Sequence, residues 1–266
     1  MNKPIFVLGV GAQKAGTTWL YEYIKSDSKS NMGMLKEYHI WDAVLKPELC
    51  SNYLSKNPNS DIAKFRLRHQ MQFNLNAYEN YFNSLINNEK LITGDITPSY
   101  SVLSMNDFLY IKERIVNAGF NIKVVYLMRD PVQRCWSAMK MEYGSLFQNN
   151  QNNLFRIYEE FEEIYKSNQY IARTRYDQTL AALEKVFDKD QLWIGVYENL
   201  FIKETINDLS EFLNIGFNPE FMENKFNITV STGLDDETAI NCRKFYEIVY
   251  DYCDNKIPIT QSLWAR

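Results

Sequence analysis

Residue types that define several protein classes are scarce in this chain of 266 residues. It contains only four cysteines, which are widely scattered, and only two histidines, His39 and His69. The cysteines are too few for a disulfide framework, and no cluster of His and Cys offers the usual zinc ligands. We therefore expect no metal site, and we expect a reducing, cytoplasmic compartment.

Neither an excess of basic charge nor a long apolar run is present. The 29 Lys and Arg residues face 33 Asp and Glu residues, giving a net charge of −4, which disfavours a dedicated nucleic-acid binder. No apolar run approaches the roughly 20 residues that a transmembrane helix needs. The run from Ile5 to Ala12 follows the positive charge of Lys3, and a signal peptide also has a short apolar run after a positive charge. Two glycines interrupt this run, however, and the polar residues Gln13 and Lys14 follow it at once. We interpret this run as a buried strand.

Short apolar segments alternate with segments of helical period along the chain. Such alternation predicts a parallel sheet covered by helices on both faces, and the 45% hydrophobic content suffices for one large core. We expect a single α/β domain over residues 1–266, with a helical and loop-rich cap from about residues 30 to 90 and 140 to 175. The predicted strands are Ile5–Val10, Leu91–Ile96, Ile122–Met128 and Leu192–Tyr197. The predicted helices include Thr17–Ser26, Ser104–Ala118, Leu154–Tyr165, Tyr176–Phe187, Glu204–Leu213 and Thr238–Tyr252.

The strongest functional signal is the glycine-rich turn between the first predicted strand and helix, Gly11-Ala12-Gln13-Lys14-Ala15-Gly16-Thr17-Thr18. It matches the nucleotide phosphate loop GxxxxGK[ST] except that Thr17 replaces the lysine, which lies three residues earlier, at Lys14. Free amides at the start of the helix still offer donors to an anion. The loop suits one phosphate and a further anionic group better than ATP, and it predicts a P-loop-type, three-layer α/β/α fold. The alternative is a plain glycine turn.

The second signal is a predicted strand that ends on Arg129 and is followed by Asp130, Pro131 and a helix with Ser137. An arginine at the carboxyl end of a parallel strand lies where open α/β sheets bind ligands, and it can bind a phosphate with two hydrogen bonds. Ser137 adds a hydroxyl donor. The alternatives are that Arg129 pairs with Asp130 or a helix end, and that Ser137 is a small packing residue. Together the two segments predict two anion sites on adjacent edges of one sheet.

Both segments resemble those of the sulfotransferases that use 3′-phosphoadenosine 5′-phosphosulfate. In that family the strand–loop–helix holds the 5′-phosphosulfate, and a strand ending in RDP, with a serine eight residues after the arginine, holds the 3′-phosphate. The resemblance also implies a nucleotide contact for Tyr176, whose alternative is packing on the sheet. The donor-binding residues that it implies are Gln13, Lys14, Ala15, Gly16, Thr17, Thr18, Arg129, Ser137 and Tyr176.

A third segment, Lys36-Glu37-Tyr38-His39-Ile40-Trp41-Asp42, resembles the KExHFFD segment of the glycosaminoglycan-type sulfotransferases. The likeness implies that Glu37 is the catalytic base and that His39 and Asp42 support it in the acceptor cleft, while Lys14 stabilises the bridging oxygen of the donor. It implies transfer of a sulfuryl group to a hydroxyl, with a carbohydrate or glycoconjugate favoured. A lipid headgroup, a small alcohol or phenol, and an amine stay open as acceptors.

The segment Gly94 to Tyr100 resembles the EKxPxY strand end of the same family, with departures. Many polysaccharide-acting relatives carry a lysine where this chain has Ile96 and an arginine where it has Thr18. Both replacements remove positive charge, which disfavours a highly anionic polysaccharide acceptor. The basic loop that clamps the 3′-phosphate in relatives is not evident between Asn224 and Asp235, where Lys225 is the best candidate.

Two other functional classes share some of these features. A nucleotide kinase or NTPase would have the same phosphate loop, but the missing lysine after Gly16 disfavours it. A nucleotide-binding module without catalysis would keep both anion sites. The presence of Lys14 and Glu37 favours an enzyme over such a module.

Overall fold

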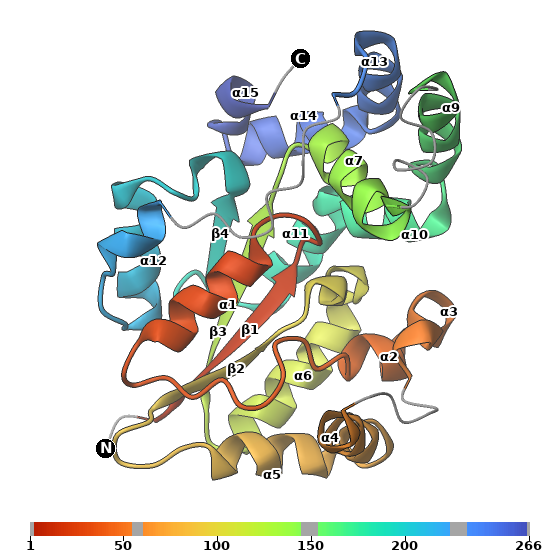
Figure 1. Cartoon of the computed structure of the whole chain (residues 1–266). Coiled ribbons are helices and arrows are strands. Elements are labelled where there is room, and N and C mark those ends of the chain that lie inside the picture. The colour runs from red at the N-terminus through yellow and green to blue at the C-terminus, as the bar shows by residue number, and fades with distance from the viewer. Residues whose placement is uncertain (1–2, 55–60, 145–153, 224–232, 265–266) are drawn as a thin grey trace.

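The computed structural model of the chain describes residues 3–54, 61–144, 154–223 and 233–264. Its sheet has four strands, all parallel, in the order β2–β1–β3–β4 (Figure 1). This confirms the predicted parallel sheet, and each strand begins and ends within one residue of its predicted bounds. The strands are β1 (Ile5–Gly11), β2 (Ile92–Ile96), β3 (Asn121–Met128) and β4 (Leu192–Val196).

Continuous apolar runs explain why β1 and β3 lie at the centre of the sheet. Every residue of β1 after Ile5 is buried, as is the end of β3 from Val124 to Met128. A strand covered on both faces requires such a run rather than an alternating pattern. Gly94 lets β2 approach β1 closely, because a Cβ atom there would lie 2.1 Å from the carbonyl oxygen of Val7.

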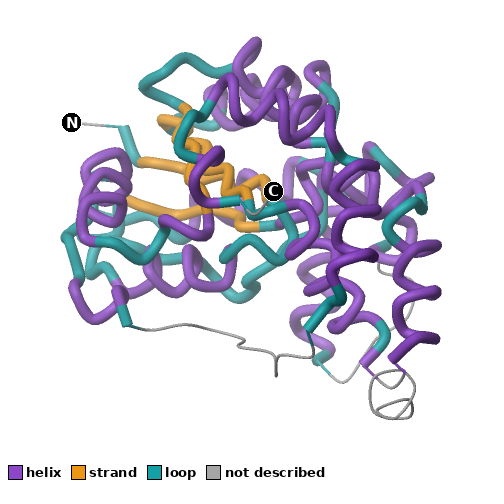
Figure 2. The backbone as a smooth tube through the Cα atoms, turned by 90° about the horizontal axis from the view of Figure 1, so that it is seen from above, coloured by secondary structure: helices purple, strands orange, loops and turns teal. Residues whose placement is uncertain are grey.

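Helices flank both sides of the strands, and a group of helices stands beside the sheet (Figure 2). No helix in the described part of the chain has both the length and the apolar character needed to cross a bilayer. The helices before β3 are α1 (Thr17–Ser26), α2 (Trp41–Leu45), α3 (Pro47–Cys50), α4 (Ile62–Phe73), α5 (Asn76–Ser84) and α6 (Met105–Asn117). Those after β3 are α7 (Pro131–Glu142), α9 (Leu154–Ile164), α10 (Asn168–Thr174), α11 (Tyr176–Val186), α12 (Lys203–Leu213), α13 (Asp236–Phe245), α14 (Glu247–Lys256) and α15 (Thr260–Leu263).

The helices beside the sheet come from two parts of the chain. Helices α9 and α10 fall within the predicted cap, and both pack on α7. Helix α13 also packs on α7 and α9, although the sequence pattern did not place it in the cap. The cap therefore includes a helix from the end of the chain.

One predicted helix is wrong in its extent. The segment Thr238–Tyr252 is part of two helices, α13 and α14, which are separated at Tyr246. The buried residues Cys242, Tyr246 and Val249 continue one helical stripe across this break, and no Gly or Pro marks it. The pattern therefore could not reveal it. The hydroxyl of Tyr246 donates a hydrogen bond at 2.6 Å to the carbonyl oxygen of Tyr165, the residue that follows α9.

Candidate active site

A cavity lies at the carboxyl end of the sheet, and the segments that follow all four strands line it. Ligands of open α/β sheets bind in this position. The strands β1 and β3, which carry the two predicted anion sites, are neighbours in the sheet. The lining residues that follow the strands are Gln13 and Lys14 after β1, Pro98 and Ser99 after β2, Arg129 after β3, and Tyr197 after β4.

The predicted phosphate loop connects β1 to α1. Gly16 precedes the helix with φ 94°, and a Cβ atom there would lie 3.0 Å from Leu200 and 3.1 Å from Tyr197, so glycine suits the position. No side chain in the described part of the chain caps α1, which leaves the first amides of this helix available to an anion. Gln13, Lys14, Gly16, Thr17 and Thr18 all line the cavity, whereas Ala15 is buried behind it.

Several positive charges surround Lys14. Its pKa is lowered by burial and then by the charges of Arg129, Lys36 and Lys140, and only Glu37 acts in the opposite direction. A lysine whose pKa is lowered by neighbouring cations lies close to them without enough negative charge nearby. The cavity therefore suits an anionic ligand.

Arg129 reaches the cavity from the end of β3. Its Nη1 donates a hydrogen bond to the carbonyl oxygen of Lys14 at 3.3 Å, and its guanidinium lies over the ring of Tyr197, 4.6 Å from the centroid. Its buried Nε has no hydrogen-bond partner among the residues that the structure describes. The alternative in which Arg129 pairs with Asp130 is not what the structure shows, because the Asp130 carboxylate accepts hydrogen bonds from the Gln133 amide and the Tyr250 hydroxyl.

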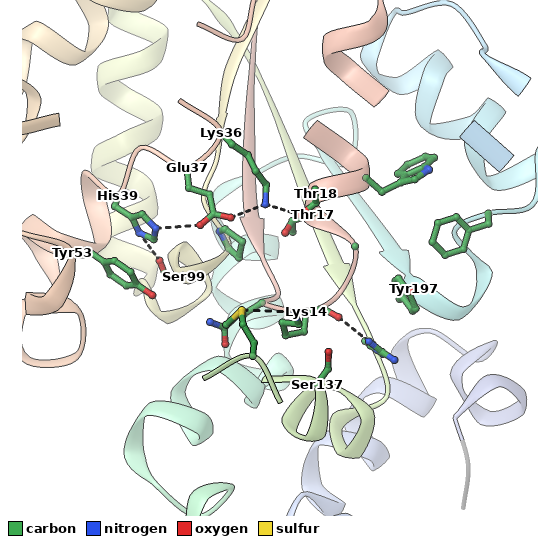
Figure 3. A pocket seen from close by; sticks show the side chains of 17 residues that line it. Lys14, Thr17, Thr18, Lys36, Glu37, His39, Tyr53, Ser99, Ser137 and Tyr197 are labelled. Atoms are coloured by element: carbon green, nitrogen blue, oxygen red, sulfur yellow. Dashed lines mark hydrogen bonds and ion pairs between the residues drawn. The ribbon is translucent and has the colours of Figure 1, made fainter. Parts of the chain in front are cut away.

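The same aspartate explains how Ser137 reaches the cavity. Asp130 caps α7 through its 2.9 Å hydrogen bond from the Gln133 amide, and Pro131 occupies the first turn of the helix. Helix α7 therefore begins directly after β3, and Ser137 lines the cavity on its second turn. Figure 3 shows Ser137 on the same side of the cavity as Lys14.

The opposite side of the cavity carries a row of paired charges (Figure 3). The Nζ of Lys36 lies 2.8 Å from one Glu37 oxygen, and the Nε2 of His39 lies 3.3 Å from the other. The Nδ1 of His39 lies 2.7 Å from the buried carboxylate of Asp42. Lys36, Glu37 and His39 line the cavity, whereas Asp42 lies outside the lining and contacts His39.

These pairs change the protonation of both central groups. Burial favours the neutral form of Glu37, but the hydrogen bond with His39 and the charge of Lys36 outweigh it and lower the pKa to about 2. Burial likewise lowers the pKa of His39, but its hydrogen bonds with Asp42 and Glu37 outweigh burial and raise the pKa to about 9. At neutral pH the cavity therefore presents a Glu37 carboxylate beside a His39 imidazolium.

Side chains from other elements hold residues 36–42, called here the Glu37 segment, in place. The hydroxyl of Thr97 accepts a hydrogen bond from the Tyr38 amide at 3.0 Å, and the hydroxyl of Tyr100 accepts one from the Ile40 amide at 3.2 Å. Both hydroxyls donate at 2.6 Å to the carboxylate of Asp95, whose burial raises its pKa to about 6. Because side chains satisfy its peptide groups, the segment needs no regular secondary structure.

Helix α4 satisfies the carbonyl groups of the same segment. Arg68 donates hydrogen bonds to the carbonyl oxygens of Glu37 at 2.9 Å and Tyr38 at 2.8 Å, and Gln72 donates to that of His39 at 2.6 Å. These contacts support a left-handed backbone at His39, with φ 54°. The orientation of Glu37 and His39 thus depends on residues of α4 and on those that follow β2.

Tyr176 lies away from the cavity, and the sequence motifs leave out other lining residues. Tyr176 is fully buried and is not a lining residue, and its ring packs near Tyr126 and Trp264 as in the packing alternative. Tyr53, which no motif predicted, lines the cavity and stacks on His39 with 3.8 Å between ring centroids. Lys36 was part of the quoted segment but had no predicted role. Lys225 lies outside the described residues.

Known proteins resemble this chain in sequence pattern and in fold. The sequence matches the model of the sulfotransferase domain family over residues 4–231. A sulfotransferase structure from Alicyclobacillus acidocaldarius is similar, with a TM-score of 0.60, 17% identity, and coverage of 97% of this chain and 96% of that one. The sulfotransferase domain from the curacin biosynthetic pathway has a TM-score of 0.51, 17% identity, and coverage of 91% and 83%. These two likenesses concern the fold, and no curated protein matches the chain.

Proposed function

The chain belongs to the sulfotransferase domain family, and from this premise we propose that it transfers the sulfuryl group of 3′-phosphoadenosine 5′-phosphosulfate to an acceptor hydroxyl. One observation carries the proposal: the phosphate loop with its cations and the Glu37 carboxylate line the same cavity. A donor bound by the loop would then lie within reach of a base. The proposal assigns the reaction to one domain, residues 1–266.

The polar groups of the cavity fit such a donor. The Nε of Arg129 is a hydrogen-bond donor that is buried without a partner in the described ranges, and buried donors normally have one. In the proposal the loop amides with Thr17 and Thr18 hold the 5′-phosphate, and Arg129 with Ser137 holds the 3′-phosphate. Both ends of the nucleotide are anionic, which suits the cation cluster around Lys14.

The donor supplies an activated sulfuryl group, and the protein orients the acceptor and moves its proton. The acceptor oxygen forms a bond to sulfur while the bond from sulfur to the bridging oxygen breaks. The electron pair of the broken bond stays on the 5′-phosphate, where Lys14 stabilises the developing charge. Glu37 accepts the proton of the hydroxyl, and His39, held by Asp42, orients the Glu37 carboxylate.

The acceptor class is proposed from the Glu37 segment, which resembles that of carbohydrate-acting sulfotransferases. We propose a hydroxyl of a carbohydrate or glycoconjugate. The flat surface of Tyr53, stacked on His39, supports this choice because an aromatic ring at the cavity wall can pack against a sugar ring. The cytoplasm is the proposed location, since the four cysteines are free thiols.

Calorimetric titration with 3′-phosphoadenosine 5′-phosphate tests both anion sites, with ATP and magnesium as the comparison. We expect micromolar binding of the bisphosphate, loss of that binding in Arg129→Ala, and no comparable binding of ATP. Arg66→Ala is the matched control, because Arg66 is exposed on α4 and does not line the cavity. Preference for ATP and magnesium would favour a kinase or NTPase. Tight binding of the bisphosphate without sulfuryl transfer to any acceptor in a broad carbohydrate screen would favour a non-catalytic module.

A further inference from the structure

Lys36 connects the two sides of the cavity. Its Nζ donates a hydrogen bond to the Thr18 hydroxyl at 2.7 Å and lies 2.8 Å from the Glu37 carboxylate. Figure 3 shows the Lys36 side chain extending from the Glu37 segment towards the start of α1. The side chain is 31% exposed and lines the cavity, so a ligand can reach its ammonium group.

We propose that Lys36 is a catalytic residue that binds the sulfuryl group during transfer, and that this contact draws Lys36 away from Glu37 and strengthens Glu37 as a base. The inference rests on the proposed function. It gives the reaction a second stabilising cation, Lys36, in addition to Lys14. It also explains why Glu37 would become a stronger base only when the donor is bound.

The position of the ammonium group supports a contact with the sulfuryl group. In the proposed reaction the sulfur lies between the bridging oxygen, near Lys14, and the acceptor oxygen, near Glu37. Lys36 is hydrogen-bonded to Thr18 at the amino end of α1 and to Glu37, so it lies between these two regions. Its charge also lowers the pKa of Lys14, which indicates that both cations act on the same space.

Lys36 also supplies positive charge next to Thr18, where the sequence motif has none. Thr18 stands where many related enzymes carry an arginine, which predicted less positive charge near the sulfuryl group. The structure shows an ammonium group 2.7 Å from the Thr18 hydroxyl, contributed by a segment that follows α1. Lys36 therefore supplies positive charge to the place that Thr18 leaves neutral.

The second part of the proposal follows from the state of Glu37 without a donor. While Lys36 and His39 both bind it, the pKa of this carboxylate is about 2, and such a carboxylate is a weak base at neutral pH. Sulfuryl oxygens compete with Glu37 for the Lys36 ammonium. When Lys36 turns to them, Glu37 loses one of its two cationic partners and its proton affinity rises. Only the sulfated donor offers these oxygens, so the base is strengthened when there is a group to transfer.

The test compares two nucleotides that differ only in the sulfuryl group. Binding of 3′-phosphoadenosine 5′-phosphosulfate and of 3′-phosphoadenosine 5′-phosphate is measured by calorimetry without acceptor, in wild type, Lys36→Met and Lys36→Arg. We expect Lys36→Met to lose about tenfold in affinity for the phosphosulfate, a typical value for one charge-assisted hydrogen bond, while affinity for the bisphosphate stays within about twofold. Lys36→Arg should restore most of the difference. Lys29→Met is the matched control, because Lys29 is exposed and outside the cavity.

Two further measurements test the contact with the sulfuryl group and the effect on the base. Removal of a group that contacts the transferred sulfuryl group should lower kcat about a hundredfold. The acid limb of the kcat/KM profile, which reports the free enzyme, should move to higher pH in Lys36→Met, because Glu37 has then lost the cation that lowers its pKa. A lysine that only anchored the segment would weaken both nucleotides alike.

The outcomes separate the inference from the proposed function. If wild type binds neither nucleotide, the proposed function fails. If wild type binds both and Lys36→Met weakens both equally, or weakens neither, the inference is overturned and the proposed function stands. Thermal unfolding checks each variant. Lys36→Gln, which removes the charge but keeps a hydrogen-bond donor, replaces Lys36→Met in the same comparison if that variant does not fold.

Discussion

The free energy of unfolding is expected to fall between pH 6.5 and 9 because of His39. The His39 side chain is 9% exposed and lies 2.7 Å from Asp42 and 3.3 Å from Glu37. Burial alone would lower its pKa, but the hydrogen bonds with both carboxylates raise it from 6.5 to about 9. The folded protein therefore keeps this proton at pH values where the unfolded chain has lost it.

The sign and size of the effect follow from proton linkage. Because the pKa is higher in the folded state, the stabilisation is complete below pH 6.5 and is lost as the pH rises through 9. One pKa unit corresponds to about 1.4 kcal/mol, so the change from 6.5 to about 9 corresponds to about 3 kcal/mol of the free energy of unfolding. This is a substantial part of the stability of an ordinary domain.

Urea unfolding from pH 6 to 9.5, at constant ionic strength, measures this effect in wild type and in His39→Gln. The difference between the two proteins cancels the titrating groups that do not interact with His39, and we expect wild type to lose about 3 kcal/mol relative to the variant. His69→Gln is the matched control, because His69 is the only other histidine and is exposed on α4. It should follow wild type. Equal pH slopes for wild type and His39→Gln would refute the charge arrangement described around Glu37.

Three further predictions concern catalysis and packing. Lys14→Ala and Glu37→Gln should each lower kcat at least about a hundredfold in a sulfuryl-transfer assay, and full turnover in Glu37→Gln would remove its assignment as base. Thr97→Val removes the acceptor of the amide groups of residues 38 and 39 and should lower kcat while bisphosphate affinity is unchanged; weaker nucleotide binding would contradict this positioning role. Gly94→Ala should destabilise the protein by about 3 kcal/mol in urea unfolding, since its Cβ would lie 2.1 Å from the Val7 carbonyl oxygen, and a midpoint equal to wild type would be inconsistent with this packing.

Features with a local physical cause could be predicted from the sequence. The apolar run of β1 and the glycine turn after it identify a buried strand, a loop and a helix from adjacent residues alone. Arg129 was placed correctly because it follows a strand of a parallel sheet, and the carboxyl ends of such strands share one edge. The order of β1 and β3 as neighbours then brings Lys14 and Arg129 into hydrogen-bond contact.

Features that depend on distant contacts could not be predicted. The orientation of Glu37 depends on Arg68 and on Thr97, which are far from it in the chain and carry no pattern that points to it. Tyr53 stacks on His39 from a segment without a motif. Tyr176 is the reverse case. Its place at a helix start predicted a position at the cavity, but its ring is buried near Tyr126. In each case tertiary packing decides the direction of a side chain, and local sequence does not record it.

The charges around Glu37 limit which acceptors can bind in the cavity. Ile96 is fully buried and outside the lining, so no charge comes from that position. The charged groups that remain are Lys36, Glu37, His39 and Asp42, whose positive and negative charges pair with one another. If Lys36 turns to the sulfuryl group, two carboxylates are left with one imidazolium. An anionic acceptor would then meet repulsion at the base, whereas an uncharged hydroxyl would not. The balance of charge therefore favours an acceptor that is neutral around the reacting hydroxyl.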